Sequence, residues 1–388
     1  MRDFVCKKIK GIKPSGIRKL FDIASEMPDA LSLGVGEPDF DTPWHIRDEG
    51  IYALQKGRTF YTGNAGLPEL RVAICGYVKK KYGLDYDPKS ETIVTVGGSE
   101  AIDLAFRATL NSGDEVVYPE PCFVSYAPCV LLADGVPVTI PLSSATNFKL
   151  TAEKLEAAIT PRTKALLMSY PNNPTGAIME KKDLEPIAEV VKKHDLLVIT
   201  DEIYCELTYK GSHASIASLP GMQERTILIN GFSKTYAMTG WRLGYALAPA
   251  EIMQYMVKIH QFGIMSAPTV SQYAAIDAIK NSDGDIEMMR ESYNQRRRYL
   301  MAAFREMELP CFEPFGAFYV FPDISEFGMT SEEFCTKLLQ EEKVAVVPGS
   351  AFGDCGDKYV RISYAYSLDA LREAMKRLAR FVKKLRGK

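Results

Sequence analysis

The apolar run Leu196-Leu197-Val198-Ile199-Thr200 follows directly on a helical pattern that spans residues 183–194. A short run of this kind, rich in β-branched residues and without polar alternation, is typical of a strand buried on both faces. The same alternation of strand and helix patterns extends from residue 92 to residue 248. It predicts an α/β fold in three layers, a mostly parallel sheet with helices on both faces.

Seven strand patterns lie in this part of the chain, with helical patterns at 100–110, 126–133, 150–159 and 183–194 between them. The strand patterns cover residues 92–96, 115–118, 136–141, 165–169, 196–200, 226–229 and 243–248. The last two are separated by little helix. We therefore expect them to pair antiparallel at one edge of the sheet.

The polar stretch 281–285 interrupts two helical patterns and is our predicted domain boundary. Beyond it, helical patterns (287–307, 331–342 and from 367) mix with short strand patterns (316–321, 345–347 and 359–363). We predict a large cofactor-binding domain of residues 46–284 and a small α+β domain of residues 1–45 and 285–388. The run Arg296-Arg297-Arg298 is assigned to the solvated face of a helix.

Composition narrows the possible functions. The 388 residues carry a net charge of −2, which gives no electrostatic reason for a nucleic acid or an anionic membrane as partner. No apolar run approaches the ~18 residues of a spanning helix, and the charged N-terminus is unlike a secretory signal. The eight cysteines form no C-x-x-C pair and the four histidines no H-x-x-x-H pair. We expect free thiols in a reducing cytoplasm and no metal site.

One lysine, Lys234, lies among small, hydroxyl and aromatic residues in the segment 231–244. Desolvation and the nearby Arg242 both disfavour its ammonium form, so the free amine can attack a carbonyl. Ser233 and Arg242 suit a phosphate group. A phosphate-bearing aldehyde that reacts with amines is pyridoxal phosphate.

Asp201 ends the buried strand pattern, and Tyr204 follows three residues later. A buried carboxylate requires a cationic partner, and a protonated pyridine nitrogen would be one. Tyr204 could donate to the phenolate oxygen of the same ring. The structural alternative is that Asp201 caps a following helix.

Two small-residue turns follow predicted strands. Gly97-Gly98-Ser99 opens a helix, where backbone N–H groups form an anion site, although Ser99 as a simple N-cap explains the pattern equally well. Asn173 lies in the turn 171–176, at the carboxyl end of a strand where ligands bind in open α/β sheets.

An arginine and a glycine complete the set of candidates. Arg361 lies inside an apolar strand pattern, where its guanidinium suits bidentate capture of a substrate carboxylate or, alternatively, an internal ion pair. Gly34 and Gly36 would let the backbone approach a ligand closely, or they mark an irregular strand end.

These motifs together resemble the fold-type I pyridoxal-phosphate aminotransferases of class I/II, a family with the aspartate aminotransferase fold. The similarity runs from the segment 17–22 to the segment 359–363. The resemblance implies that Lys234 holds the cofactor covalently and moves the proton of the α-carbon. It also implies that Asp201 pairs with the pyridinium nitrogen and that Asn173 and Tyr204 bond the ring oxygen.

The remaining roles also come from the resemblance. Phe123 would stack on the ring, and Arg361 would bind the substrate α-carboxylate with the backbone at Gly36 closing over it. Tyr61 resembles the tyrosine that reaches the phosphate of a neighbouring subunit, which implies a homodimer with shared active sites. The phosphate itself would be held by Gly98, Ser99, Ser233 and Arg242.

The implied activity is ping-pong transamination in amino acid metabolism, with 2-oxoglutarate and glutamate as the partner pair. Ser99 replaces the lysine that some aspartate-preferring relatives carry, and Phe123 replaces a common tryptophan. Aspartate, aromatic amino acids and N-acetyl-diaminopimelate therefore all stay open as substrates. A carbon–sulfur β-lyase with the same cofactor site is the alternative. A regulatory protein that keeps the fold without turnover is disfavoured, because no basic helix-turn-helix segment is present.

Overall fold

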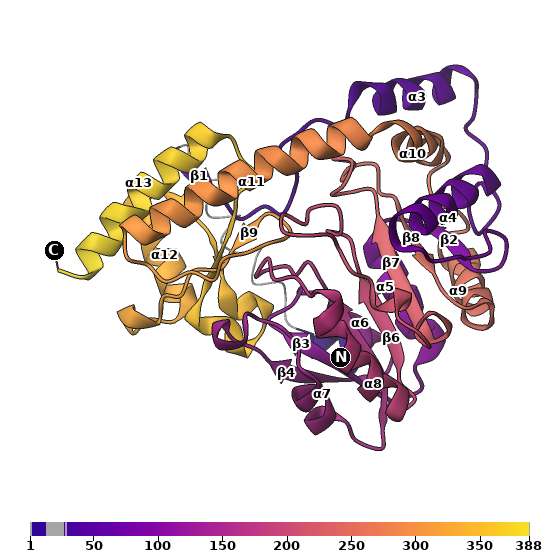
Figure 1. Ribbon diagram of the computed structural model, residues 1–388, viewed down its shortest axis with the longest axis horizontal. Coiled ribbons are helices and arrows are strands. Elements are labelled where there is room, and N and C mark those ends of the chain that lie inside the picture. Colours follow the sequence, from indigo (N-terminus) through magenta and orange to yellow (C-terminus); the bar gives the residue numbers. More distant parts are fainter. Residues whose placement is uncertain (1, 13–26, 28, 388) are drawn as a thin grey trace.

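The computed structural model describes residues 2–12, 27 and 29–387, and it contains two main sheets (Figure 1). The segment 17–22, with which the predicted resemblance begins, lies outside the described residues. The larger sheet has seven strands in the order β2-β8-β7-β6-β5-β3-β4. Its strands are β2 (Thr92–Thr95), β3 (Glu115–Glu120), β4 (Val136–Pro141), β5 (Thr163–Ser169), β6 (Leu197–Asp201), β7 (Thr226–Gly231) and β8 (Gly244–Leu247).

The predicted mostly parallel sheet is confirmed, with one correction. Strand β8 pairs antiparallel with β7, as expected, but it does not form the edge of the sheet. It lies between β7 and β2, and its other side pairs antiparallel with β2 in the register Thr92↔Leu247. All four residues of β8 are buried, so a second strand is needed to satisfy its remaining backbone groups.

Alternate residues of the central strands face opposite helix layers. Leu166 and Met168 of β5 belong to one apolar cluster, which includes residues of α7 and α8. Ala165 and Leu167 belong to another, which includes residues of α5, α6 and α9. The helices of this part are α3 (Trp44–Gln55), α4 (Pro68–Tyr82), α5 (Gly98–Thr109), α6 (Tyr126–Leu132), α7 (Ala152–Ala158), α8 (Lys181–Lys193), α9 (Ala250–Gly263) and α10 (Thr269–Asn281). Because successive side chains of a strand point to opposite faces, the sheet packs against helices on both sides and forms the predicted three layers.

A smaller sheet of three antiparallel strands has the order β11-β12-β9. Its strands are β9 (Tyr319–Val320), β11 (Val347–Pro348) and β12 (Val360–Ser363). The helices of this part of the chain are α11 (Asp283–Glu306), α12 (Ser331–Glu342) and α13 (Leu368–Leu385). The N-terminal strand β1 (Leu31–Ser32) pairs in parallel with β10 (Val344–Ala345). A short N-terminal helix, α1 (Lys7–Lys10), contacts the turn that follows α6 through an ion pair between Lys8 and Asp134 at 2.6 Å. The division into domains at residues 46 and 284 stays a prediction.

Local signals set several helix ends. Helix α12 starts at Ser331 because Thr330 and Glu333 form a reciprocal capping box. Helices α10 and α11 are separated at Ser282, inside the polar stretch that predicted a break. At this junction the imidazole of His45 bonds Asp277 of α10 and Asp285 of α11, the latter at 3.0 Å. Figure 1 shows α11 as a long helix that runs from α10 to the side of α13.

The predicted solvation of the arginine run on α11 is wrong for Arg297. Arg297 is buried, and its guanidinium donates to Glu313 at 2.9 Å. Arg296 pairs with Asp39 at 2.7 Å, so only Arg298 is exposed. The apolar stripe of α11 includes Tyr293 and Leu300, which are three or four residues from Arg297 and carry it into the interior.

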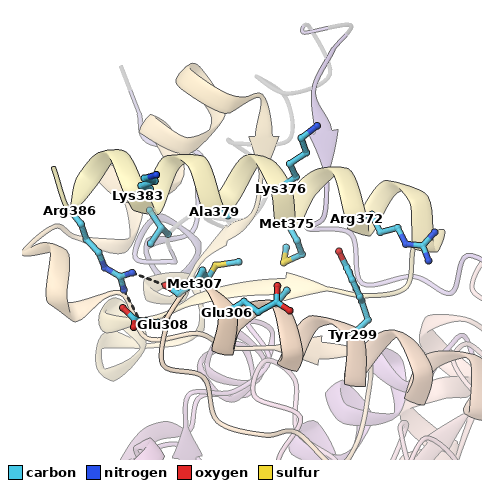
Figure 2. A pocket seen from close by; sticks show the side chains of 12 residues that line it. Tyr299, Glu306, Met307, Glu308, Arg372, Met375, Lys376, Ala379, Lys383 and Arg386 are labelled. Atoms are coloured by element: carbon cyan, nitrogen blue, oxygen red, sulfur yellow. Dashed lines mark hydrogen bonds between the residues drawn. The ribbon is translucent and has the colours of Figure 1, made fainter. Parts of the chain in front are cut away.

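A shallow groove separates α11 from α13 (Figure 2). Arg386, at the end of α13, crosses it and donates to the carbonyl oxygens of Met307 and Glu308 at 2.7 and 2.9 Å. Lys376 and Lys383 line the groove without converging on a common point. Within the part of the chain that the structure describes, no helix is both long and apolar enough to cross a membrane.

Candidate active site

A second hollow, a cavity of about 410 Å³, lies where the carboxyl ends of β5 and β6 meet β9 and β12 of the small sheet. Unlike the groove of Figure 2, it draws polar groups from distant parts of the chain to one place. It brings together all of the predicted site residues except Tyr61. These residues are Gly36, Gly98, Ser99, Phe123, Asn173, Asp201, Tyr204, Ser233, Lys234, Arg242 and Arg361.

Lys234 enters the cavity from the loop that follows β7. Its ammonium nitrogen donates to the carbonyl oxygen of Gly36 at 2.7 Å. The pKa of Lys234 is lowered to about 8, chiefly by burial, and the nearby cations Arg361 and Arg242 contribute to this shift against the opposing charge of Glu37. The side chain therefore has a substantial fraction of free amine near neutral pH, as the sequence predicted.

Asp201, the last residue of β6, is buried at the floor of the cavity. One carboxylate oxygen accepts from the hydroxyl of Tyr126 at 2.8 Å, and the other accepts from the backbone N–H of Ile203 at 3.1 Å. Burial nevertheless raises the pKa of Asp201 to about 6. The described backbone after Asp201 forms turns rather than a helix, so the alternative role as a helix cap does not apply.

Tyr204 follows on the same turn and is also buried. Its hydroxyl forms a 2.8 Å hydrogen bond with the hydroxyl of Tyr319, which lines the cavity from β9. Burial raises the pKa of Tyr204 well above its ordinary value, so the hydroxyl stays protonated and able to donate. The sequence reasoning missed both Tyr319 and Tyr126.

Arg361, on β12, is a buried cation with 3% of its surface exposed. One of its terminal nitrogens donates to the side-chain oxygen of Asn173 at 2.9 Å, and the other donates to the carbonyl oxygen of Gly34. Its Nε has no partner, and none of the described carboxylates forms an ion pair with it. This excludes the internal ion pair among the described residues and leaves the guanidinium suited to an anion.

The other end of the cavity has the geometry of an anion cradle. Helix α5 begins at Gly98, and its N-cap residue is Gly97 at φ 78°, without a side-chain cap from Ser99. This positive φ favours glycine, and a Cβ at Gly97 would lie 2.7 Å from a terminal nitrogen of Arg242. The free N–H groups of α5, Arg242 and Ser233 thus border one region.

Tyr61 lies apart from the cavity. It is 81% exposed and borders a different hollow, which Phe60 and Pro268 also line. Phe60 and Phe262 are equally exposed, at 81% each. Large aromatic side chains left in solvent are typical of a surface that another protein covers.

Comparison with known proteins gives consistent matches. The family described as "Aminotransferase class I and II" matches residues 28–378. The chain is 49% identical to the aspartate aminotransferase of Pyrococcus abyssi over 96% of each chain. It is 46% identical to aromatic-amino-acid aminotransferase 2 of Thermococcus litoralis over 97% of each. The solved structure of the aromatic aminotransferase from Pyrococcus horikoshii OT3 superimposes with a TM-score of 0.91 at 49% identity, covering 94% of this chain and 99% of that one.

Proposed function

The chain belongs to the class I and II aminotransferases, and from that premise we propose that pyridoxal phosphate binds in the cavity around Lys234. The protein is an aminotransferase, and the family works by a ping-pong transfer between an amino acid and a 2-oxo acid. What is proposed is the cofactor site, the role of each residue in it, the substrate and the assembly.

One observation carries the proposal: the half-buried Lys234 and the buried Asp201 and Arg361 surround a single cavity, and their charges are not paired with one another. Arg361 has an unpartnered Nε, and Asp201 has neutral donors only. A bound group with a cationic ring nitrogen and an anionic phosphate, together with a substrate carboxylate, would balance these charges. The residues therefore fit pyridoxal phosphate.

When bound, the cofactor supplies the carbonyl that reacts with amines and the ring that accepts electrons. Lys234 would hold it covalently and then, as a free amine, take the proton from the substrate's α-carbon. The lowered pKa suits this task, since a base works best when its pKa lies near the working pH. Asp201 would stay ionised against the ring nitrogen, because a cationic partner opposes the effect of burial on its pKa.

The remaining residues would bind and orient. Tyr204 and Asn173 would donate to the ring oxygen, and Phe123 would stack against the ring. Gly98, Ser99, Ser233 and Arg242 would hold the phosphate at the start of α5, where the helix dipole favours an anion. Arg361 would hold the α-carboxylate, with Gly36 closing the cavity above it.

Of the three substrates left open, we favour an aromatic amino acid as donor. After Lys234, Arg242 and Arg361 are assigned, no further cation among the described residues lines the cavity. Val35, Ile102 and Phe123 give the lining an apolar character. An aspartate side chain would leave its carboxylate without a partner in this subunit, whereas an aromatic ring gains from burial. Aspartate and N-acetyl-diaminopimelate are the competing donors, with 2-oxoglutarate as acceptor.

We also propose a homodimer in which Tyr61 reaches the phosphate of the neighbouring subunit. The exposure of Tyr61, Phe60 and Phe262 supports this assembly. The cytoplasmic location stays a prediction from the sequence.

The test is the visible absorption of the purified, cofactor-loaded protein while single amino acids are added without an oxo acid. We expect phenylalanine or tyrosine to bleach the band, and 2-oxoglutarate to restore it. A response to aspartate alone would overturn the substrate assignment. A persistent band with release of pyruvate and ammonia from cystathionine would favour the β-lyase. No band after addition of pyridoxal phosphate would overturn the cofactor site.

A further inference from the structure

Tyr319 is a buried residue, 1% exposed, that touches several groups of the cavity and has no role in the proposed function so far. It lies on β9, beside β12, in the register Ser363↔Tyr319. Arg361 is two residues before Ser363 on β12, so the two side chains are held by one short piece of sheet. Their relative position is therefore fixed by backbone pairing.

The ring of Tyr319 supports Arg361 from one face. The centre of the guanidinium lies 4.5 Å from the Tyr319 ring centroid and 4.8 Å from that of Phe352. Asn173 and the Gly34 carbonyl accept from its terminal nitrogens. A flat cation beside aromatic faces is attracted by the ring quadrupole and loses freedom to turn.

The hydroxyl of Tyr319 serves a different neighbour. It forms the 2.8 Å hydrogen bond with Tyr204, which also lines the cavity and is the proposed donor to the ring oxygen of the cofactor. Hydrogen bonds in a chain polarise one another, so a tyrosine that accepts a hydrogen bond is a stronger donor. The hydroxyl of Tyr204 has one proton, which would go to the ring oxygen, so Tyr319 would be the donor of the bond between the two tyrosines and would strengthen Tyr204 as a donor.

The same hydroxyl also supports the segment that closes the cavity. A Cβ at Gly36 would lie 2.3 Å from the Tyr319 oxygen, so the backbone of Gly36 rests directly on it. The carbonyl of Gly36 accepts from Lys234 in turn. Three separate parts of the chain, at residues 36, 204 and 361, therefore meet at one side chain.

We propose that Tyr319 is a positioning residue with two separable actions. Its ring orients Arg361 for the substrate carboxylate, and its hydroxyl orients and polarises Tyr204 for the cofactor. The proposal rests on the proposed function, since it presumes those roles for Arg361 and Tyr204.

The experiment compares Y319F, which keeps the ring, with Y319L, which removes both ring and hydroxyl. Two equilibrium properties of the loaded protein are measured: the pH midpoint of its visible absorption, and the dissociation constants of 3-phenylpropanoate and maleate as unreactive carboxylates. Y364F is the matched control for hydroxyl loss, because the Tyr364 hydroxyl donates to Ala317 at 3.1 Å in the same apolar cluster but does not line the cavity. F321L is the control for loss of a buried ring.

We expect Y319F to raise the pH midpoint by about half a unit, because Tyr204 becomes a weaker donor to an anionic oxygen. Its carboxylate dissociation constants should stay within about twofold of the wild type, since the ring remains. Y319L should raise the midpoint equally and weaken carboxylate binding about tenfold. If Y319L does not fold, Y319M gives the same test with a flexible side chain.

Unchanged values in both variants would overturn the proposal, as would equal shifts in Y364F or F321L, which would indicate general loosening of the core. Equal weakening of carboxylate binding in Y319F and Y319L would overturn the separation of the two actions. Failure of the wild type itself to show a visible band would overturn the proposed function, and this is seen before any variant is measured.

Discussion

The two walls of the cavity carry different kinds of charge. On the wall formed by the large sheet, burial moves the pKa values of Lys234 and Asp201 to about 8 and about 6, toward neutral pH. On the opposite wall, Arg361 is a permanent cation held by aromatic rings and amide oxygens. The difference matches the two tasks of the proposed function, in which one wall would handle protons and the other would orient the substrate.

Replacing Lys234 tests the proton-handling wall most severely. K234A removes both the covalent attachment and the base, so we expect transamination to fall by more than about 10³-fold and the visible band to disappear. Activity and absorption of the loaded protein check this. K149A, which removes an ion pair with Asp183 outside the cavity, should leave both unchanged. A K234A protein with a normal visible band would contradict the assignment.

The second prediction concerns pH in the cofactor-free protein. A lysine with a pKa of about 8 has roughly 200 times more free amine at pH 7 than one with the ordinary pKa of about 10.4. Competitive acetylation, read by mass spectrometry, should therefore give a midpoint near pH 8 for Lys234. Exposed Lys182, whose pKa is raised by Glu180, should titrate at higher pH. If both lysines were acetylated with the same pH midpoint, the pKa of Lys234 would not be lowered, and the contrast between the two walls would be lost.

Replacing Arg361 tests the substrate-orienting wall. R361L removes the two charge-assisted hydrogen bonds proposed for the α-carboxylate, so kcat/KM should fall about 100-fold. The visible band should persist, and its pH midpoint should rise, because the Arg361 cation lowers the pKa at Lys234. R297L is the matched control, because it also removes a buried guanidinium, but one that pairs with Glu313 away from the cavity. An R361L variant that loses its cofactor instead would show that the walls are not independent.

The smallest expected effect is that of Y126F. This change removes the hydroxyl that donates to Asp201 at 2.8 Å, an interaction worth about 1 kcal/mol. We expect the rate to fall about fivefold, with KM for the amino donor unchanged. Steady-state kinetics measure both values. A larger effect on KM than on kcat would assign Tyr126 to substrate binding rather than to Asp201.

The same two walls differ in how well the sequence predicts them. Lys234, Asp201 and Arg361 each stand out locally, as a lysine among small residues or as a charge in an apolar strand pattern. The supporting hydroxyls do not, because Tyr126 lies 75 residues from Asp201 and Tyr319 lies 115 residues from Tyr204. Nothing near either tyrosine in the sequence identifies its partner.

The fold shows a similar limit. The alternation of strand and helix patterns was sufficient for the layers, but the position of β8 between β7 and β2 depends on pairing across some 150 residues of sequence, Thr92 with Leu247. The burial of Arg297 could have been predicted, since Tyr293, Leu300 and Phe304 mark the apolar side of the same helix. The prediction used only the charge of the three arginines, whereas the helical spacing of the apolar residues places Arg297 on the buried side.

Helix α11 has a mechanical consequence. Its 24 residues make it about 36 Å long, and it starts at the junction where His45 bonds both Asp277 and Asp285. A rotation of about 5° at that junction would move the far end of such a rod by about 3 Å. Because the apolar side of α11 packs in the same cluster as β9 and β12, such a rotation would move these strands together with the helix. A small change in angle at Ser282 would become a displacement as large as a hydrogen bond at the wall that carries Arg361.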